Sequence, residues 1–112
     1  MSMAVRQVDL LQGTLDLLVL KILSTAPNHG YGIAMRIHQL SDDALRVEEG
    51  SLYPALQKLL LKGWVKATWS VSDSGREVRE YRITASGKKQ LAAELADYRR
   101  VTEAIHLLLE KA

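Results

Sequence analysis

Cysteine and phenylalanine are absent from this 112-residue sequence, and aromatic residues make up only 5% of it. Without cysteine the chain can form no disulfide and can use no thiolate as a nucleophile or metal ligand. No apolar run approaches the roughly 18 residues that a membrane span needs, and no signal peptide is recognisable at the N-terminus. We therefore expect a protein of the cytoplasm that has no membrane partner.

The residue patterns that catalysis or metal binding would need are also missing. His29, His38 and His106 fall in three separate segments, so they offer no metal-ligand spacing. No glycine-rich phosphate loop follows a predicted strand, and no serine occurs in a G-x-S-x-G elbow. Gly50 and Ser51 could cradle a phosphate at a helix start, but a DNA phosphate accounts for them equally well. The sequence predicts a protein that is not an enzyme and uses no cofactor.

What the sequence does contain is an ordinary globular composition with an uneven distribution of charge. Apolar residues make up 47% and charged residues 25%, as in a single globular domain. So short a chain buries a modest core, which favours an obligate dimer. The formal net charge is +2, but residues 58–89 carry eight basic side chains against three acidic ones. This indicates one surface that faces a polyanion, although a solvated face of mixed charge would give the same pattern.

Two helical patterns occupy the first part of the chain. The first, from Thr14 as N-cap to the stop at Pro27, is apolar on nearly every side. Such a helix must be buried on more than one face, so we expect its second face to meet a partner subunit. The alternative is the central core helix of a monomer. The second helix begins at Tyr31, beside two glycines that suit a tight turn, and ends before Ser41.

A third helix is predicted with Gly50 or Ser51 as its N-cap, Pro54 in its first turn and Gly63 at its stop. Val47, in the preceding connector, is expected to pack against the same core as this helix. The inward-facing residues of the helix recur at helical spacing, and they are Leu52, Leu56, Leu59 and Leu60.

Two segments rich in aromatic and β-branched residues, 64–71 and 77–83, flank the turn sequence SDSG and predict a β-hairpin. On its second strand Tyr81 is expected to face inward. Trp64 and Trp69 have opposite parity, so they cannot face the same core, and Trp64 is the better core candidate. For Trp69, packing is favoured over an exposed position in which it would contact a ligand or a partner.

Thr84 is expected to cap a long final helix over residues 85–111. Apolar positions in it recur at alternating steps of four and three, which is typical of a coiled-coil seam. The seam consists of Leu91, Leu95, Tyr98, Thr102, Ile105 and Leu109. Because so short a seam needs further contacts, we expect a dimer interface that also includes Leu15, Leu18 and Ile22.

This order of elements predicts a fold that is mainly α with a small β-hairpin. Three compact helices followed by a twisted hairpin form the winged helix-turn-helix arrangement. We expect a winged helix-turn-helix DNA-binding domain over residues 1–84, whose N-terminal helix contributes to the dimer, and a dimerisation helix over residues 85–112.

In a helix-turn-helix the N-terminal residues of the third helix meet base edges and phosphates in the major groove. Ser51, Tyr53, Gln57 and Lys58 fall in this half of the predicted helix and are candidate DNA-binding residues. Tyr53 offers a hydroxyl to a phosphate, and Gln57 can pair with N6 and N7 of adenine. The alternatives are packing of Tyr53 against a neighbouring helix and an ordinary exposed position for Gln57.

The hairpin is the predicted wing. Arg76 and Arg79 flank its tip, where basic side chains can follow a phosphate backbone or enter the minor groove. The same arginines could instead serve as a charged edge that discourages aggregation. Tyr31 is also predicted to lie near the DNA backbone, although simple packing fits it equally well. Lys62 and Lys66 are expected to be solvated.

Four blocks of the chain resemble, in order, the successive blocks of PadR-like transcriptional regulators: "LLQGTLDLLVLKIL", "HGYGIAMRI", "EEGSLYPALQKLLLKGWV" and "REYRITASGKKQL". The resemblance implies a homodimeric winged-helix repressor that binds an inverted-repeat operator. It implies DNA contacts by Tyr31, Ser51, Tyr53 and the wing arginines, with the first and last helices in the dimer interface. Members of this family tend to respond to small aromatic molecules, so such an effector is a candidate partner.

Two features keep other interpretations open. Tyr98 is the sole aromatic residue of the last helix, so these residues do not support an aromatic effector sandwiched between rings of that helix. A winged helix can also bind a protein, and the basic segment would suit an acidic protein partner. The salt dependence of binding separates this alternative from DNA binding, because phosphate contacts weaken steeply with ionic strength.

Overall fold

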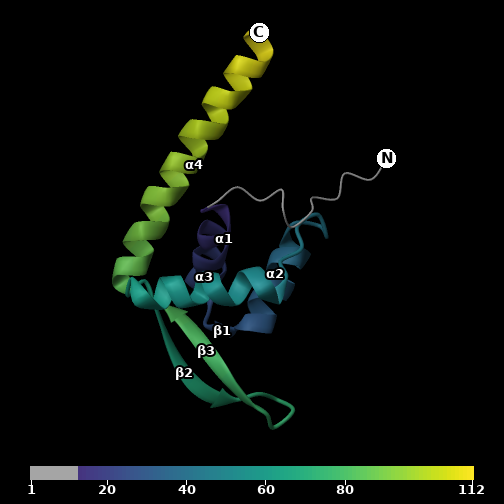
Figure 1. The fold of residues 1–112 in the computed structure, drawn as a ribbon, viewed down its shortest axis with the longest axis vertical. Helices are drawn as coiled ribbons and strands as arrows, with labels where there is room; N and C mark the ends of the chain where they lie inside the picture. The colour runs from purple at the N-terminus through teal and green to yellow at the C-terminus, as the bar shows by residue number, and fades with distance from the viewer. Residues whose placement is uncertain (1–12) are drawn as a thin grey trace.

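The computed structural model describes residues 13–112 as four helices and a small antiparallel sheet (Figure 1). The predicted fold class, mainly α with a small β element followed by a long C-terminal helix, is confirmed. The start of the predicted domain at residue 1, and the part of the family-like sequence before residue 13, lie outside the described residues. Within the described part no helix is both long and apolar enough to cross a membrane.

Helix α1 (Thr14–Thr25) is the central helix of the body and contacts α2, α3, α4 and β3. Other elements of the same chain bury α1 on several sides. This agrees with the alternative in which it is the central core helix of a monomer. The predicted cap is wrong: Gly13 is the N-cap, with a φ of 89°, and Thr14 is the first helical residue. The positive φ explains the difference, since glycine adopts this conformation without steric cost.

Helix α2 (Gly30–Leu40) starts from a short strand that the sequence did not predict. Strand β1 (Asn28–His29) pairs with β3, so the sheet has three strands in the order β1-β3-β2. His29 caps the helix, because its Nδ1 accepts a hydrogen bond of 3.1 Å from the Gly32 amide. Gly30 and Gly32 are therefore in the first helical turn, and the predicted tight turn around Tyr31 is wrong.

Helix α3 (Glu49–Leu61) begins earlier than predicted. Its N-cap is Glu48, so neither Gly50 nor Ser51 is the cap. Pro54 consequently lies in the second turn, where its ring nitrogen can donate no hydrogen bond to the Gly50 carbonyl. The predicted stop is confirmed, since Gly63 has a φ of 74° immediately after the helix. The predicted inward positions are buried or partly buried in the core: Val47, Leu52, Leu56, Leu59 and Leu60.

The wing is the hairpin of β2 (Val65–Val71) and β3 (Glu77–Ile83), close to the predicted bounds. Tyr81 is buried as predicted. Trp69 shares the face of Val65, which packs in the core, but the sheet extends beyond the body and leaves Trp69 71% exposed. The favoured packing of Trp69 is therefore wrong, and the exposed alternative is right. Trp64 lies before β2 and packs against the core.

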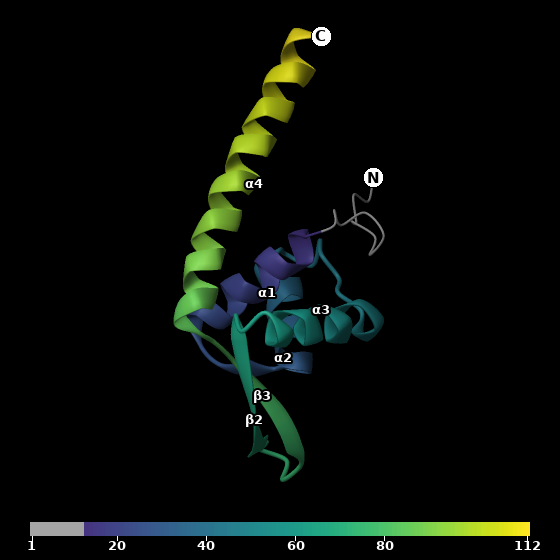
Figure 2. The ribbon, with the colours of Figure 1, turned by 60° about the vertical axis from the view of Figure 1, so that its left-hand side comes forward.

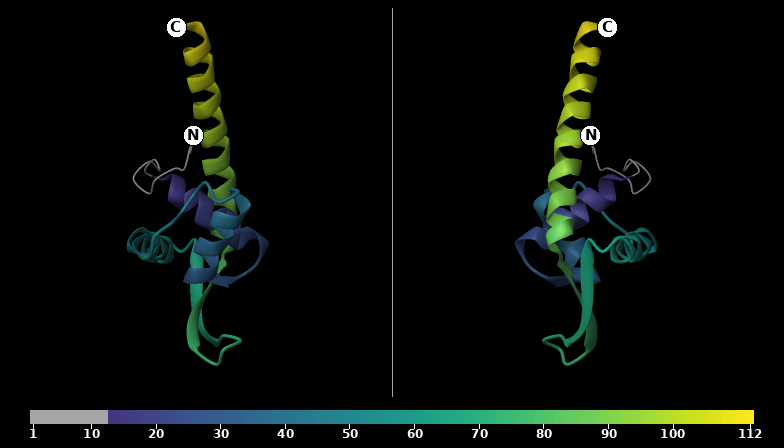
Figure 3. Two further views of the ribbon diagram at one scale, coloured as in Figure 1. Left: turned by 90° about the vertical axis from the view of Figure 1, so that its right-hand side faces the viewer. Right: turned by 90° about the vertical axis from the view of Figure 1, so that its left-hand side faces the viewer.

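The start of helix α4 (Ala85–Lys111) lies next to the end of α3 in space. The Thr84 hydroxyl accepts a hydrogen bond of 3.0 Å from the Gly87 amide and donates one of 2.7 Å to the Gly63 carbonyl, so the predicted cap is confirmed. The first turns of α4 pack against α1, and the helix then leaves the body (Figure 2). The wing and α4 extend from the body in opposite directions (Figure 3).

Candidate nucleic-acid interface

A concave groove of about 740 Å³ lies between the wing and the starts of α2 and α3. Four of the predicted DNA-binding residues line it together, although they are up to 48 positions apart in the chain. These four are Tyr31, Tyr53, Arg76 and Arg79. The groove also contains Trp69 from β2 and His29 from the cap of α2. The fold thus brings the start of the second helix, the third helix and the wing to one surface.

Tyr53 packs against a neighbouring helix and is also partly exposed. Its ring lies so close to Gly30 that a Cβ atom there would be 2.8 Å from the Tyr53 hydroxyl oxygen, so the ring packs against the start of α2. The side chain is nevertheless 44% exposed. Gly30 therefore lets α2 and α3 approach each other while Tyr53 keeps an accessible edge in the groove.

Gln57 and Ser51 also lie on α3, but neither is among the residues that line the groove. Gln57 is exposed and follows Tyr53 by one helical turn, so the two side chains share a face of the helix. Ser51 is half-buried in the first turn. Gln57 thus extends the Tyr53 face of α3 beyond the groove.

On the wing, Arg79 and Trp69 are cross-strand partners on the face that lines the groove. The Arg79 guanidinium donates a hydrogen bond to the Tyr81 hydroxyl. Burial raises the pKa of Tyr81, and the neighbouring Arg79 charge offsets part of that rise. Tyr81 thus lies beside Arg79 on the groove face of β3. Trp69 was missed as a site residue, because parity alone does not reveal that the sheet extends beyond the body.

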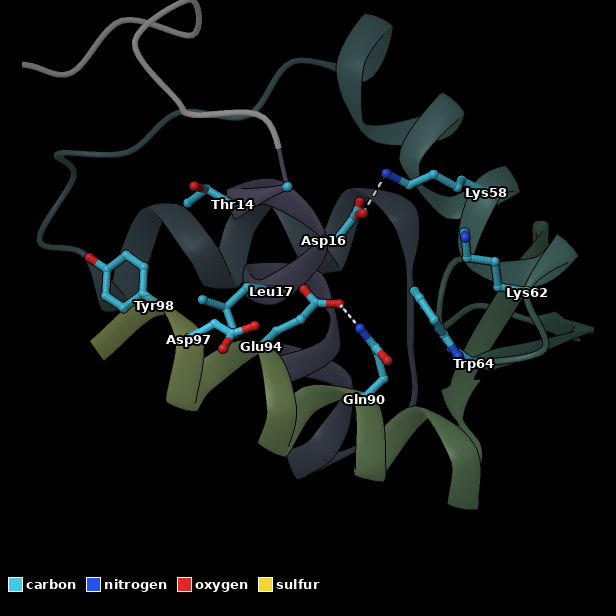
Figure 4. Close-up of a pocket in the computed structure, with 11 residues that line it drawn as sticks. Thr14, Asp16, Leu17, Lys58, Lys62, Trp64, Gln90, Glu94, Asp97 and Tyr98 are labelled. Atoms are coloured by element: carbon cyan, nitrogen blue, oxygen red, sulfur yellow. Dashed lines mark hydrogen bonds and ion pairs between the residues drawn. The ribbon is translucent and has the colours of Figure 1, made fainter. Parts of the chain in front are cut away.

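Lys58 has a different neighbour from the one predicted. Its Nζ atom lies 2.5 Å from Oδ2 of Asp16 on α1, so its charge is paired within the chain. Lys62 is exposed, as expected, and its Nζ lies 5.2 Å from the centre of the Trp64 ring. Both lysines line a cleft of about 380 Å³ between α1, α3 and α4 (Figure 4) and not the wing groove.

The clustering of basic residues in segment 58–89 had indicated that they share one surface. In the structure they lie on more than one surface. Lys66 and Arg82 are cross-strand neighbours on the face of the sheet opposite the groove. The groove itself has two arginines beside three acidic residues, Glu49, Asp73 and Glu77. The lining side chains of the groove therefore carry no excess of positive charge.

The predicted dimer residues divide into two groups. Ile22 is buried in the chain's own core, and Leu15, Leu18 and Leu91 pack against that core, so they leave little surface for a partner. The exposed group is Tyr98, Ile105 and Leu109 on the projecting part of α4, with Leu95 half-buried before them.

Three further apolar residues of α4, Val101, Leu107 and Leu108, are exposed. Steps of three and four also connect Tyr98, Val101, Ile105 and Leu108, so this second seam was visible in the sequence. It is apolar throughout, whereas the predicted seam contains Thr102, whose hydroxyl donates to the Tyr98 carbonyl at 2.8 Å. The two seams together form an apolar band along the far half of α4.

The described residues contain no group of three or more histidine and acidic side chains that could hold a metal ion. In the described range, the side-chain nitrogen and oxygen atoms that are fully buried all have hydrogen-bond partners. The geometry thus offers an exposed groove with aromatic and guanidinium groups, which suits binding to an extended polar surface.

Comparison with known proteins shows which family the chain is similar to. The model of the transcriptional regulator PadR-like family matches residues 19–93. An uncharacterized protein X of Lysinibacillus sphaericus is 31% identical over 103 residues, which cover 91% of this chain and 94% of that protein. A PadR-like transcriptional regulator from Bacillus cereus superposes with a TM-score of 0.75 at 25% identity, covering 90% of this chain and 96% of the other. For a PadR family transcription regulator from Clostridium difficile the TM-score is 0.74 at 27% identity, with coverage of 87% and 99%.

Proposed function

This chain belongs to the PadR-like family of transcriptional regulators, and we propose that it is a homodimeric repressor which binds an inverted-repeat DNA operator. The chain's role as a transcriptional regulator follows from the family. We assign DNA binding to residues 1–84 and dimerisation mainly to residues 85–112. A repressor of this kind works on chromosomal DNA, so its place of action is the cytoplasm.

The observation that carries the proposal is the convergence of Tyr31, Tyr53, Arg76 and Arg79 on one groove. In a winged helix the third helix enters the major groove of DNA. The arginines of the wing can then follow the phosphate backbone or enter the adjacent minor groove. Gln57 is the candidate for a base-edge contact, since its exposed amide can pair with adenine N6 and N7.

Homodimer formation is supported by the apolar band of α4. Its side chains include Tyr98, Val101, Ile105 and Leu108, which are exposed in the single chain. A symmetric dimer buries the same patch of both subunits. If the apolar bands of two subunits packed against each other, both bands would be shielded from water. Two copies of α3 would then meet the DNA about one turn apart, roughly 34 Å, or a multiple of that distance.

The cleft between α1, α3 and α4 is the candidate site for a small-molecule effector that releases the DNA. Its lining includes the aromatic residues Trp64 and Tyr98 (Figure 4), and its volume of about 380 Å³ suits a small ligand. Because α3 and α4 both contribute to it, an occupant could change their relative position. Quenching of Trp64 fluorescence in a Trp69→Phe variant, titrated with phenolic acids, tests this part; an unchanged signal would rule out these ligands.

The alternative is a winged-helix module that binds an acidic protein. Trp69 and Val71 give it specific support, since both apolar side chains are exposed on the wing. The apolar part of a protein partner would cover them, whereas DNA phosphates would not. Binding through an apolar interface weakens little as salt rises, whereas contacts to several phosphates weaken steeply. The salt dependence therefore decides between the two functions.

The test is fluorescence anisotropy with a labelled duplex from the region upstream of the chain's own gene and an unrelated duplex of equal length. We expect tighter, salt-sensitive binding to the upstream duplex. The double substitution Arg76→Ala and Arg79→Ala should flatten the salt slope, by about 0.9 for each phosphate that the wing no longer neutralises. Lys88→Ala with Lys89→Ala is the matched control, because it removes the same charge from exposed positions at the start of α4.

Equal, weak binding to both duplexes would contradict the proposal, and binding that ignores salt would favour the protein-partner alternative. Tyr53→Ala and Gln57→Ala address α3 separately from the wing. Each should weaken binding to the upstream duplex and leave the sedimentation behaviour of the protein unchanged. Loss of the dimer with retained DNA affinity would show that the residue had been placed on the wrong surface.

A further inference from the structure

Asp16 is a buried carboxylate in a helix that is otherwise apolar inside. It lies in the first turn of α1 with 7% of its surface exposed, and it is the charged residue that the described core contains. Burying an ionised carboxylate is costly unless another charge pairs with it. The groove, the wing and the apolar band of α4 make no use of this side chain, which lines the cleft between α1, α3 and α4.

The partner of Asp16 is on the DNA-reading helix. Lys58 of α3 extends across to α1, and its Nζ lies 2.5 Å from the Asp16 Oδ2 atom (Figure 4). The pairs Arg82–Glu80 and Arg100–Asp97 each lie within one strand or one helix. The Asp16–Lys58 pair instead joins two elements that are far apart in the sequence, so it restrains one relative to the other.

Helix α3 lacks two local hydrogen bonds that can support the first turns of a helix. The Glu48 side chain makes no capping hydrogen bond to the helix start, and Pro54 removes one backbone hydrogen bond. Leu52, Leu56 and Leu59 hold the helix to the core, but apolar contacts are not directional. A short charge-assisted hydrogen bond is directional, so the ion pair can set the rotation of α3.

The rotation of α3 determines which side chains meet the DNA. Lys58 follows Gln57 directly, so the two project about 100° apart around the helix axis. With Lys58 held at α1, Gln57 and Tyr53 must point away from α1 on an adjoining face. The same contact pairs the half-exposed Lys58 with a carboxylate of the chain, outside the wing groove.

We infer that Asp16 is a positioning residue for DNA recognition: it holds Lys58 to α1 and so fixes the face of α3 that reads the operator. The inference rests on the proposed function, which it deepens by assigning Lys58 to an internal contact. The inference makes two predictions. Loss of the pair must weaken operator binding and preference, and loss of Lys58 must not reduce the number of counterions released.

The experiment uses the full chain with Asp16→Asn and Lys58→Met combined, which leaves no unpaired buried charge. Anisotropy titrations at several salt concentrations are expected to show at least about tenfold weaker binding to the upstream duplex. The preference over the unrelated duplex should fall while the salt slope stays that of the unaltered protein. Lys58→Arg, which keeps a cation for Asp16, should restore binding. His38→Gln with Asp43→Asn removes an ion pair at the end of α2, outside the groove, the cleft and the apolar band, and should change nothing.

A salt slope flatter by about 0.9 per protomer would overturn the inference, because Lys58 would then contact a phosphate. Affinity within about twofold of the unaltered protein would also overturn it. Amide hydrogen exchange without DNA gives an independent readout: exchange within α3 should be faster in the Asp16/Lys58 variant and unchanged in the control. Unchanged exchange in α3 would refute the restraint itself. If the unaltered protein shows no DNA preference, the proposed function fails, and exchange alone decides whether the pair restrains α3.

Discussion

Leucine is used in opposite ways in the two parts of this molecule. In the body, Leu20, Leu52 and Leu59 are completely buried by other elements of the same chain. On the far half of α4, Leu108 is 64% and Leu109 is 70% exposed. The body therefore has a core within one chain, whereas the projecting helix presents apolar side chains that the described residues leave exposed.

The difference shows which contacts each part needs in order to be stable. A helix of a few turns without packing is marginal in water, and within the described residues the apolar side chains of α4 beyond Tyr98 are exposed. A large exposed apolar patch marks an interaction surface. The body should thus be stable as a monomer, while the order of the α4 end should depend on the proposed second subunit.

The largest effect should come from a substitution in the body. Leu59→Ala creates a cavity in the core, and we expect a loss of about 2–5 kcal/mol in the free energy of unfolding. The matched substitution Leu108→Ala should change the unfolding of the body by less than about 0.5 kcal/mol. Urea denaturation followed by Trp64 fluorescence measures both. Similar losses for the two leucines would remove the distinction between the two parts.

The second effect concerns the apolar band. Ile105→Glu with Leu108→Glu places two like charges in each half of the proposed dimer interface, and burying them unpaired is costly. We expect sedimentation velocity to show a monomer at concentrations where the unaltered chain is a dimer. Near-ultraviolet circular dichroism of the body should remain unchanged. Glu103→Gln with Glu110→Gln changes exposed acidic positions on the same helix and provides the control. A dimer that survives the two glutamates would place the interface elsewhere.

A smaller effect is expected where the two parts join. Thr84 caps α4 and at the same time donates to the carbonyl of Gly63, which ends α3. Thr84→Ala should lower the free energy of unfolding by about 1 kcal/mol, and Thr84→Ser should retain most of it. Thermal denaturation of the two variants side by side gives the comparison. Equal melting temperatures for alanine and serine would show that the cap contributes nothing.

The smallest effect is a pH dependence confined to the body. Burial raises the pKa of Tyr81 above its ordinary value, so at high pH the folded state holds a proton that the unfolded state releases. Its contribution to stability should be complete below about pH 10 and should decline as the pH rises further. Urea midpoints at about pH 9 and about pH 10.5, on either side of the ordinary tyrosine pKa, should differ more in the unaltered protein than in Tyr81→Phe. An equal difference in both proteins would exclude this contribution.

The elements that local patterns determine could be predicted from the sequence. The two hairpin strands, the turn between them and the Thr84 cap depend on neighbouring residues, and all three are confirmed. Thr84 also illustrates the limit, since its hydrogen bond to Gly63 joins residues 21 positions apart. Local periodicity contains no information about such partners.

The features that the sequence did not reveal depend on distant contacts. Lys58 has the residue type and the position in the sequence that are expected of a DNA contact. Only the fold reveals that Asp16 lies beside it. Strand β1 is two residues long and exists because β3 pairs with it. Trp69 follows the parity of the core, but its exposure depends on how far the sheet extends past the body. Assignment of the remaining site residues to DNA is still a prediction.

Hydroxyl-radical footprinting on the upstream duplex tests most directly the claim that two copies of α3 read one operator. We expect two protected patches on one face of the DNA, with centres about 34 Å or a multiple of it apart. In the Ile105→Glu and Leu108→Glu variant, protection should weaken at both patches together. A single patch in the unaltered protein, or uniform protection without a repeat, would contradict the proposed dimeric repressor.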